Sequence, residues 1–248
     1  MIPDLTLLSG VDIPFAEAGI SIHQPSIKEI GLIGEETFYA GSELLTFSKD
    51  ILKEEDRNNL EHKSNFEILM SIMTDSKQPE LQKSRVSAML VLSLLFPEYR
   101  IKLELDKILL MKEDEVHSIN SKNFEKFKEN LIAMFCLRGM DDENNPTYNP
   151  GGDLAKKIVE KFNKRREVVT KQEGPKKISI LGRYVSILSV GERKNMNDLM
   201  KYTVYQLFDE FKRYELKEQF DHYVHARLAG AKDLKEVDNW KKDIHPEI

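Results

Sequence analysis

The chain has 248 residues, 40% of them hydrophobic and 32% charged, and its formal net charge at pH 7 is −5. A chain of this length and composition buries one sizeable core or two modest ones. Its negative charge disfavours wholesale nucleic-acid binding, since a duplex binder needs a basic face to displace counterions.

Three features of the sequence predict a protein of the cytoplasm. No segment has the roughly eighteen consecutive apolar residues of a membrane span. Residues 1–15 lack the basic start and long apolar run of a signal peptide. Cys136 is the sole cysteine, which excludes an internal disulfide, and its apolar neighbours predict a buried thiol in a reducing compartment. We therefore expect no membrane contact.

The N-terminal part predicts an arm, a strand and a helix. Residues 1–19 hold two prolines and two glycines among scattered apolar residues, which indicates an irregular arm. Residues 20–23 alternate as a short strand does. Ser26 and Glu29 then form a capping box that opens a helix through Leu45. Three glycines weaken this helix and predict either the close approach of another helix or a break: Gly31, Gly34 and Gly41.

Two more helices follow a charged segment. Residues 48–63 are interpreted as a short solvated helix or a loop. A second capping box, Ser64 with Glu67, opens a helix through Met73. Residues 80–96 are apolar nearly all round a helix, which predicts a central place in the core. The methionines at positions 70, 73 and 89 are interpreted as core gap-fillers.

The hydrophobic period changes to two between residues 99 and 119. Residues 100–105 and 116–119 alternate, residues 108–111 form a short apolar run, and charged turns separate them. This predicts a small antiparallel hairpin or meander inserted in a helical protein. Its edges could pair with the strand at 20–23 or with a neighbouring subunit; the alternative is a sheet that packs only on its own helices. Another helix follows and ends near Gly139.

A polar linker at residues 139–152 separates the two halves of the chain. Its acidic and asparagine residues at 141–145 are consecutive, whereas a calcium loop needs ligands at alternate positions, so no calcium site is expected. Asp153 is the expected N-cap of the next helix. That helix carries the most basic stretch of the chain, which is either a solvated face or a patch for an acidic protein or for nucleic-acid phosphates. The patch residues are Lys157, Lys161, Lys164, Arg165 and Arg166.

The C-terminal part predicts three helices. Residues 178–188 favour a buried helix, because positions 178, 181, 185 and 188 share one face. A short helix follows at 195–200. A long amphipathic helix then begins after Thr203, a suitable N-cap, and ends at Gly230, which tolerates a left-handed conformation.

The long helix carries more aromatic surface than one packing partner needs. Its rings are spread around more than one side, which predicts a second apolar partner, either another subunit or a client segment. The alternative is an ordinary core helix with its tyrosine hydroxyls at the surface. A tryptophan beyond the helix is expected to pack back against it. The candidate partner-binding residues are Tyr205, Phe208, Phe211, Tyr214, Phe220, Tyr223 and Trp240.

The sequence shows no catalytic constellation. His222 and His225 lie close enough to share a helix face with Glu218, but the H-E-x-x-H pattern of a metalloprotease is absent. No Rossmann fingerprint, nucleophile elbow or triad-like cysteine occurs. We therefore predict a non-enzymatic protein without a metal or cofactor.

Three separated segments carry a family resemblance. They are IHQPSIKEIGLIGEETFYAGSELL at 22–45, YNPGGDLAKKI at 148–158 and YQLFDEFKRYELKEQFDHYVHARLAGAKDLKEVDNWKKDIH at 205–245. Together they resemble tail assembly chaperones, small phage proteins encoded beside the tape-measure protein in tailed phages of low-GC Gram-positive hosts. The resemblance implies a non-catalytic protein of the host cytoplasm, which shields the long apolar tape-measure chain until tail-tube subunits polymerise around it.

We predict a mainly α fold, with a helical-bundle-like core and a small antiparallel β hairpin or meander insertion at about 99–119. The expected parts are an N-terminal arm (1–19), a helical subdomain with the β insertion (20–138), a linker (139–152) and a C-terminal helical subdomain (153–248). The leading hypothesis is a chaperone that binds the tape-measure protein or other tail proteins, and homo-oligomerisation stays open. The alternatives are a structural protein of the phage neck or tail, and a nucleic-acid-associated factor that uses the basic stretch.

Overall fold

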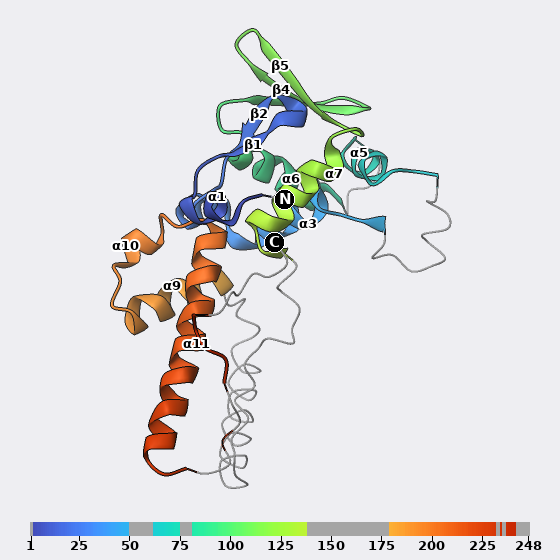
Figure 1. Cartoon of the computed structure of the whole chain (residues 1–248). Coiled ribbons are helices and arrows are strands. Elements are labelled where there is room, and N and C mark those ends of the chain that lie inside the picture. The colour runs from blue at the N-terminus through green and yellow to red at the C-terminus, as the bar shows by residue number, and fades with distance from the viewer. Residues whose placement is uncertain are drawn as a thin grey trace, which may run out of the picture.

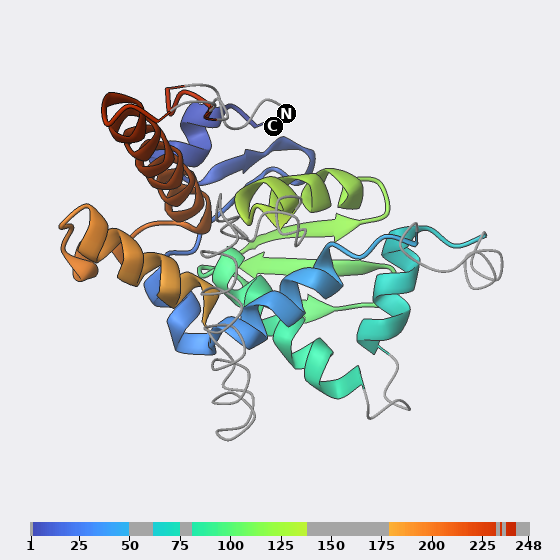
Figure 2. The ribbon, with the colours of Figure 1, turned by 90° about the horizontal axis from the view of Figure 1, so that it is seen from below.

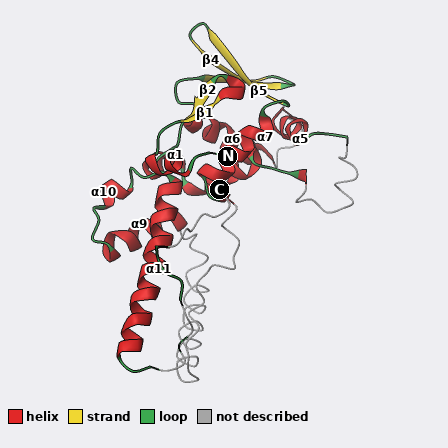
Figure 3. Cartoon of the chain, viewed as in Figure 1, coloured by secondary structure: helices red, strands yellow, loops and turns green. Residues whose placement is uncertain are grey.

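The computed structural model describes residues 2–49, 62–74, 81–137, 179–231, 234 and 237–241. Within them the fold is mainly α-helical with a small antiparallel β insertion, as predicted, and it also has a second small antiparallel sheet (Figure 1 and Figure 3). Figure 1 shows both sheets at one end, most helices beneath them, and the second half of the last helix at the opposite end. None of the described helices is long and apolar enough to cross a membrane.

The first residues form regular elements, and the irregular arm expected at 1–19 is therefore wrong. Helix α1 (Asp4–Ser9) leads to strand β1 (Ile13–Phe15), a 3₁₀ turn η1 (Ala16–Ala18) and strand β2 (Ile20–Ile22). β2 pairs antiparallel with β1, and not with the meander at 99–119. Leu7, Ile13 and Phe15 are buried in the common core. This segment is held in place by contacts with residues that are distant in sequence. Its own hydrophobic pattern therefore did not predict its helix and strands.

The helix expected from Ser26 to Leu45 is divided at Gly34. Its capping box forms as predicted, with the Glu29 N–H donating to Ser26 Oγ at 3.3 Å and the Ser26 N–H donating to Glu29 Oε2 at 2.7 Å. Gly34 has φ 86° and ψ 137°, a conformation open to glycine, and it separates α2 (Ile27–Ile33) from α3 (Glu35–Leu45). Of the two outcomes predicted for the glycines, Gly34 thus provides the break.

Helices α5 (Asn65–Thr74) and α6 (Gln82–Leu95) follow. The second capping box is present, since the Glu67 N–H donates to Ser64 Oγ at 3.2 Å and the Ser64 N–H donates to Glu67 Oε2 at 2.7 Å. α6 packs along α3, as Figure 2 shows. The predicted burial of α6 is confirmed at Val91, Leu92 and Leu95. One face of the helix is exposed, however, at Val86 and Leu90.

The meander predicted at 99–119 is a three-stranded antiparallel sheet. Strands β3 (Arg100–Leu103), β4 (Lys107–Lys112) and β5 (Glu115–Asn120) lie in that order. Ile108 pairs with Ile119 across β4 and β5, and both are buried. Helix α7 (Phe124–Met134) continues from β5 and packs beside it (Figure 2).

The C-terminal part consists of α9 (Ile180–Gly191), α10 (Met196–Leu199) and α11 (Val204–Leu228). The predicted buried face of α9 is confirmed at the described positions Leu181, Val185 and Leu188. Hydrogen bonds join this C-terminal part to the N-terminal part of the chain. The Glu35 carboxylate accepts from the N–H groups of Ile180 (2.8 Å) and Leu181 (3.1 Å), and the Ile27 N–H donates to the Tyr202 carbonyl at 2.8 Å. The expected linker at 139–152 lies outside the described residues.

Candidate functional site

The first turns of α11 are anchored to the rest of the chain. Thr203 and Gln206 form a capping box, in which the Thr203 N–H donates to Gln206 Oε1 at 2.8 Å and the Gln206 N–H donates to Thr203 Oγ1 at 3.3 Å. Gln206 also donates through Nε2 to the Leu8 carbonyl of α1 at 2.7 Å. One side chain therefore caps α11 and links it to the N-terminal helix.

Three of the predicted partner-binding aromatics are packed within the chain. Tyr205 has 0% of its surface exposed, and its hydroxyl donates to the Asp4 carboxylate. Phe211 is buried and stacks on Tyr184 of α9 with ring centroids 3.8 Å apart, while Phe208 meets the same ring edge-on at 5.1 Å. The prediction of a partner surface is therefore wrong for the buried residues Tyr205 and Phe211, and Phe208 is half-buried against Tyr184.

The other predicted aromatics are more exposed. Tyr214, Phe220 and Tyr223 are half-buried along α11, which runs away from the described body of the molecule (Figure 1). The Tyr223 hydroxyl accepts from the Arg227 guanidinium at 2.9 Å, so this pair stays within one helix. Trp240 is half-buried and lies 5.4 Å from the ammonium of Lys241. The contact of these four rings with a partner stays a prediction.

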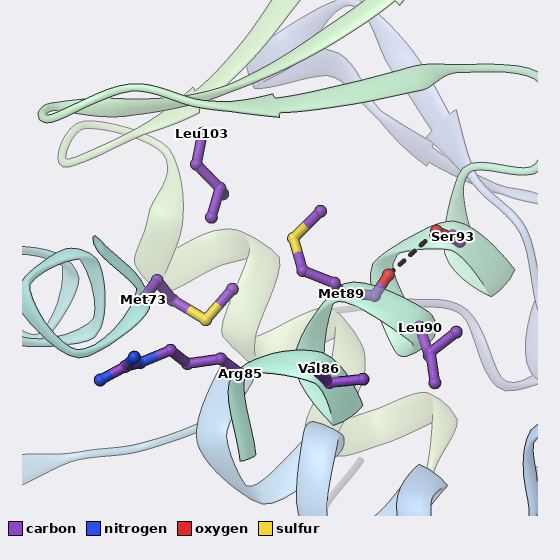
Figure 4. A pocket seen from close by; sticks show the side chains of 7 residues that line it. All are labelled: Met73, Arg85, Val86, Met89, Leu90, Ser93 and Leu103. Atoms are coloured by element: carbon purple, nitrogen blue, oxygen red, sulfur yellow. Dashed lines mark hydrogen bonds between the residues drawn. The ribbon is translucent and has the colours of Figure 1, made fainter. Parts of the chain in front are cut away.

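An open apolar groove lies on a different part of the molecule (Figure 4). It has a volume of about 250 Å³. Three elements build it: α5 through its last turn, the exposed face of α6, and the inward side of β3. The residues that line it are Met73, Arg85, Val86, Met89, Leu90, Ser93 and Leu103.

Helical spacing brings the α6 residues of the groove into one row. Val86, Leu90 and Ser93 follow one another at steps of four and three residues, which places them on the same side of the helix. On β3, Leu103 shares a face with the half-buried Ile101, whereas the alternating lysine at 102 is exposed. Val86 and Leu90 are 53% and 38% exposed. The groove is thus an apolar surface open to solvent.

The polar groups of the groove are at its two ends. The Ser93 hydroxyl donates to the Met89 carbonyl at 2.9 Å, so it is satisfied within α6 (Figure 4). The Arg85 Nε donates to the Ile72 carbonyl at 2.7 Å, which holds the guanidinium at the end formed by Met73. The described residues that line the groove include no carboxylate and no imidazole. This arrangement suits apolar side chains of a binding partner.

The ionisable groups elsewhere do not converge on a metal-binding arrangement within the described part of the chain. His222 Nε2 lies 3.9 Å from Glu218 Oε2 on α11, and both side chains are solvent-accessible. His23 lies between two acids, with Nδ1 3.0 Å from Asp12 and Nε2 3.4 Å from Glu29. The first is an isolated pair on one helix, and the second is a group of three side chains.

Cys136 follows α7 in a left-handed conformation, with φ 53°. It is half-buried, less deeply than predicted. Burial raises the pKa of its thiol to about 12, and the nearby Asp209 carboxylate adds to this effect. A thiol that keeps its proton at neutral pH is a weak nucleophile, so its environment is that of a structural cysteine.

The remaining sequence predictions lie outside the described residues. They include most of the charged segment at 48–63, the acidic segment at 141–145, the expected N-cap Asp153 and the basic patch of Lys157, Lys161, Lys164, Arg165 and Arg166. The groove was not predicted, because it combines three elements that only the tertiary fold brings together. The signal that pointed to it was the excess of apolar residues around α6, more than a helix with one buried face requires.

Comparison with known proteins gives one match. Residues 173–245, which include α9, α10 and α11, match the family model of the YomV second domain, a family derived from phage. No curated protein and no solved structure matches the chain. The match covers the last part of the chain and points to a phage protein.

Proposed function

We propose that this chain is a phage tail assembly chaperone, which binds and shields the tape-measure protein in the host cytoplasm without catalysing a reaction. The phage-derived family match and the resemblance of three segments support the phage context. The observation that carries the proposal is the groove of α5, α6 and β3, in which apolar side chains remain open to solvent.

The chemistry of the groove fits a client with apolar helical segments. Amphipathic helices bind such grooves through apolar side chains at steps of three and four residues. Each apolar side chain that a client buries contributes about 1.5–3 kcal/mol before the costs of association. Met89, which is half-buried, suits a client of variable sequence, because its unbranched side chain adapts to different shapes.

Co-purification tests the proposal. The tagged full chain is expressed together with the tape-measure product encoded nearby, and with an unrelated soluble protein as the control for tag and resin. The proposal predicts that the tape-measure product elutes with this chain and stays in the soluble fraction. A tape-measure product that remains insoluble and does not elute with it would refute the proposal.

Mass spectrometry of purified virions separates this role from that of a structural particle protein. A chaperone is released as the tail matures, so its peptides are expected in infected cells and not in virions. Peptides present in virions at amounts comparable to those of known tail proteins would contradict the chaperone role.

A further inference from the structure

We propose that β3 pairs with β3 of a second copy of this chain, so that the sheets of two copies join antiparallel about a twofold axis at Leu103. This contact is separate from the proposed client site, because it uses the backbone edge of β3 and not the face of α6. Two features of β3 carry it: backbone groups that are free at the edge, and a sequence that is complementary to itself in antiparallel alignment.

One edge of the three-stranded sheet is open in the described part of the chain. β3 is bonded to β4 on one side, and no described strand lies on its other side. The opposite edge of the sheet, β5, lies beside η1, where His117 Nδ1 is 2.9 Å from the Ala18 carbonyl oxygen. An open edge presents backbone donors and acceptors that can pair with another strand.

Alternation along the ladder identifies the free backbone groups of β3. The Glu104 N–H donates to the Lys107 carbonyl at 2.9 Å. Bonded and non-bonded positions alternate in an antiparallel pair, so the backbone groups of Lys102 point to β4 and those of Ile101 and Leu103 point to the open edge. Within the described residues, Ile101 and Leu103 have no backbone partner on that side. They are therefore available to a second strand.

The sequence of β3 and the turn that follows it, RIKLELD at 100–106, complements itself about Leu103. In an antiparallel pair centred there, each residue before Leu103 faces the residue equally far after it in the other copy. The Leu103 residues of the two copies face each other and exchange their N–H···O=C bonds. On either side every cation faces an acid and the apolar residues face each other. These facing pairs are Lys102 with Glu104, Ile101 with Leu105 and Arg100 with Asp106.

Some side chains of this segment gain a partner that they lack within one copy. Leu105 is apolar and yet 86% exposed. Arg100 and Asp106 are exposed, and neither forms an ion pair within the described part of the chain. Lys102 and Glu104 already pair inside one chain at 3.1 Å. The gain in charge pairing therefore comes from Arg100 and Asp106, at the two ends of the paired segment.

Charge also selects the register of the pair. An alignment centred on Lys102 would use the same open edge, but it would place the two lysines directly opposite each other, which is unfavourable. The alignment centred on Leu103 avoids this contact. β3 spans only Arg100–Leu103, so the interface is small, and small interfaces are typical of transient contacts. We expect a dissociation constant of about 10–300 µM at low salt.

Charge reversal tests the facing pair of Arg100 and Asp106. Sedimentation velocity of the full chain at about 5–500 µM measures the dimer. Arg100→Glu and Asp106→Arg each bring like charges together, so each should weaken the dimer at least about threefold. The double variant restores opposite charges and should return the dissociation constant to within about twofold of the wild type. Lys122→Glu changes the net charge as Arg100→Glu does, but it lies beyond β5 and should leave the dimer unchanged.

The outcomes of the charge reversal are decisive, because these residues are exposed and their substitution does not disturb the core. A wild type that stays monomeric over the whole concentration range would overturn the proposal. So would single variants that dimerise as the wild type does, or a double variant that remains as weak as the singles.

Cysteine trapping tests the register in a Cys136→Ser background, with oxidised glutathione as the oxidant. Leu103→Cys places facing thiols on residues whose Cα atoms lie about 5.5 Å apart in a bonded antiparallel pair, within the range of a disulfide. Ile101→Cys is the matched control, since it is half-buried on the same edge, but its two copies are offset along the strands by about 14 Å. We expect a covalent dimer of Leu103→Cys and none of Ile101→Cys. Equal yields, or no dimer of Leu103→Cys at concentrations where the wild type dimerises, would refute the alignment.

Discussion

Gly41 of α3 offers the sharpest test of how the helical core is packed. A Cβ atom added at this position would lie 2.4 Å from the Ser87 carbonyl oxygen, 2.6 Å from its carbonyl carbon and 2.7 Å from Val91 Cγ2, all on α6. The two nearest atoms belong to the backbone, so a side-chain rotation cannot remove the clash. Gly41→Ala must therefore push α3 and α6 apart.

The expected cost follows from two opposing effects. Alanine in a helix interior gains about 1 kcal/mol over glycine, whereas overpacking of a tight core costs about 1–3 kcal/mol and sometimes more. Because the clash is with backbone, we expect a net loss of about 2 kcal/mol in the free energy of unfolding. For a chain of this size that loss lowers the melting temperature by roughly 4–8 °C.

Gly31 of α2 is the matched control, because a Cβ added there meets nothing within 4 Å. Gly31→Ala should raise the free energy of unfolding by up to about 1 kcal/mol through helix propensity alone. Thermal unfolding followed by circular dichroism, supported by urea titration, measures both variants. If Gly41→Ala is as stable as Gly31→Ala, the close approach of α3 and α6 is not as described.

Three further predictions concern the Glu35 cap of α9, the hydrogen bond of Tyr205 to Asp4 and the thiol of Cys136. Glu35→Ala removes the carboxylate that accepts from the first N–H groups of α9 and should cost about 1–2 kcal/mol in urea unfolding. The adjacent Glu36→Ala, which breaks the surface ion pair with Lys83, should cost under about 1 kcal/mol. Equal costs would argue against the cap. Tyr205→Phe removes the hydroxyl bonded to Asp4 and should cost about 1–2 kcal/mol, with the near-ultraviolet spectrum otherwise native; an unchanged unfolding midpoint would exclude that bond. The pKa of the Cys136 thiol is about 12 in the folded state and about 8.5 in the unfolded state. The folded state therefore holds this proton more tightly. The resulting contribution to the free energy of unfolding is complete below about pH 8.5 and is lost as the pH rises towards 12. Cys136→Ser should therefore lose less stability than the wild type between about pH 8.5 and 10 in urea titrations, and parallel losses would contradict the assignment.

Local signals in the sequence predicted the parts of the fold that local physics determines. The Ser26 and Ser64 capping boxes and the Thr203 N-cap formed, because each depends on side chains within three residues of one another and on the adjoining backbone. The meander formed because alternation over residues 99–119 determines which side chains face the core. Gly31, Gly34 and Gly41 show the limit of such signals. Their presence predicted a weakened helix, but only the structure shows that Gly34 interrupts the helix and that Gly41 contacts α6 closely.

Features that depend on tertiary contacts were missed. The elements α1, β1 and η1 are too short to show a period, and they are ordered by burial of Leu7, Ile13 and Phe15 in the shared core. On α11, the amphipathic pattern did not distinguish Tyr205, which is buried against α1, from aromatics further along the helix. The methionines at 70, 73 and 89 looked alike in sequence. Met70 and Met73 are buried in the core, as predicted. Met73 also lines the groove, together with the half-buried Met89, and the sequence did not indicate this.

Hydrogen–deuterium exchange on the full chain, alone and with the tape-measure product, tests most directly whether the protein acts by binding an apolar client at the groove. We predict slower exchange over α6 and the end of α5 when the client is present, with β5 unchanged as an internal reference. Identical exchange in the two samples at saturating client, or protection confined to regions away from α5, α6 and β3, would contradict this account.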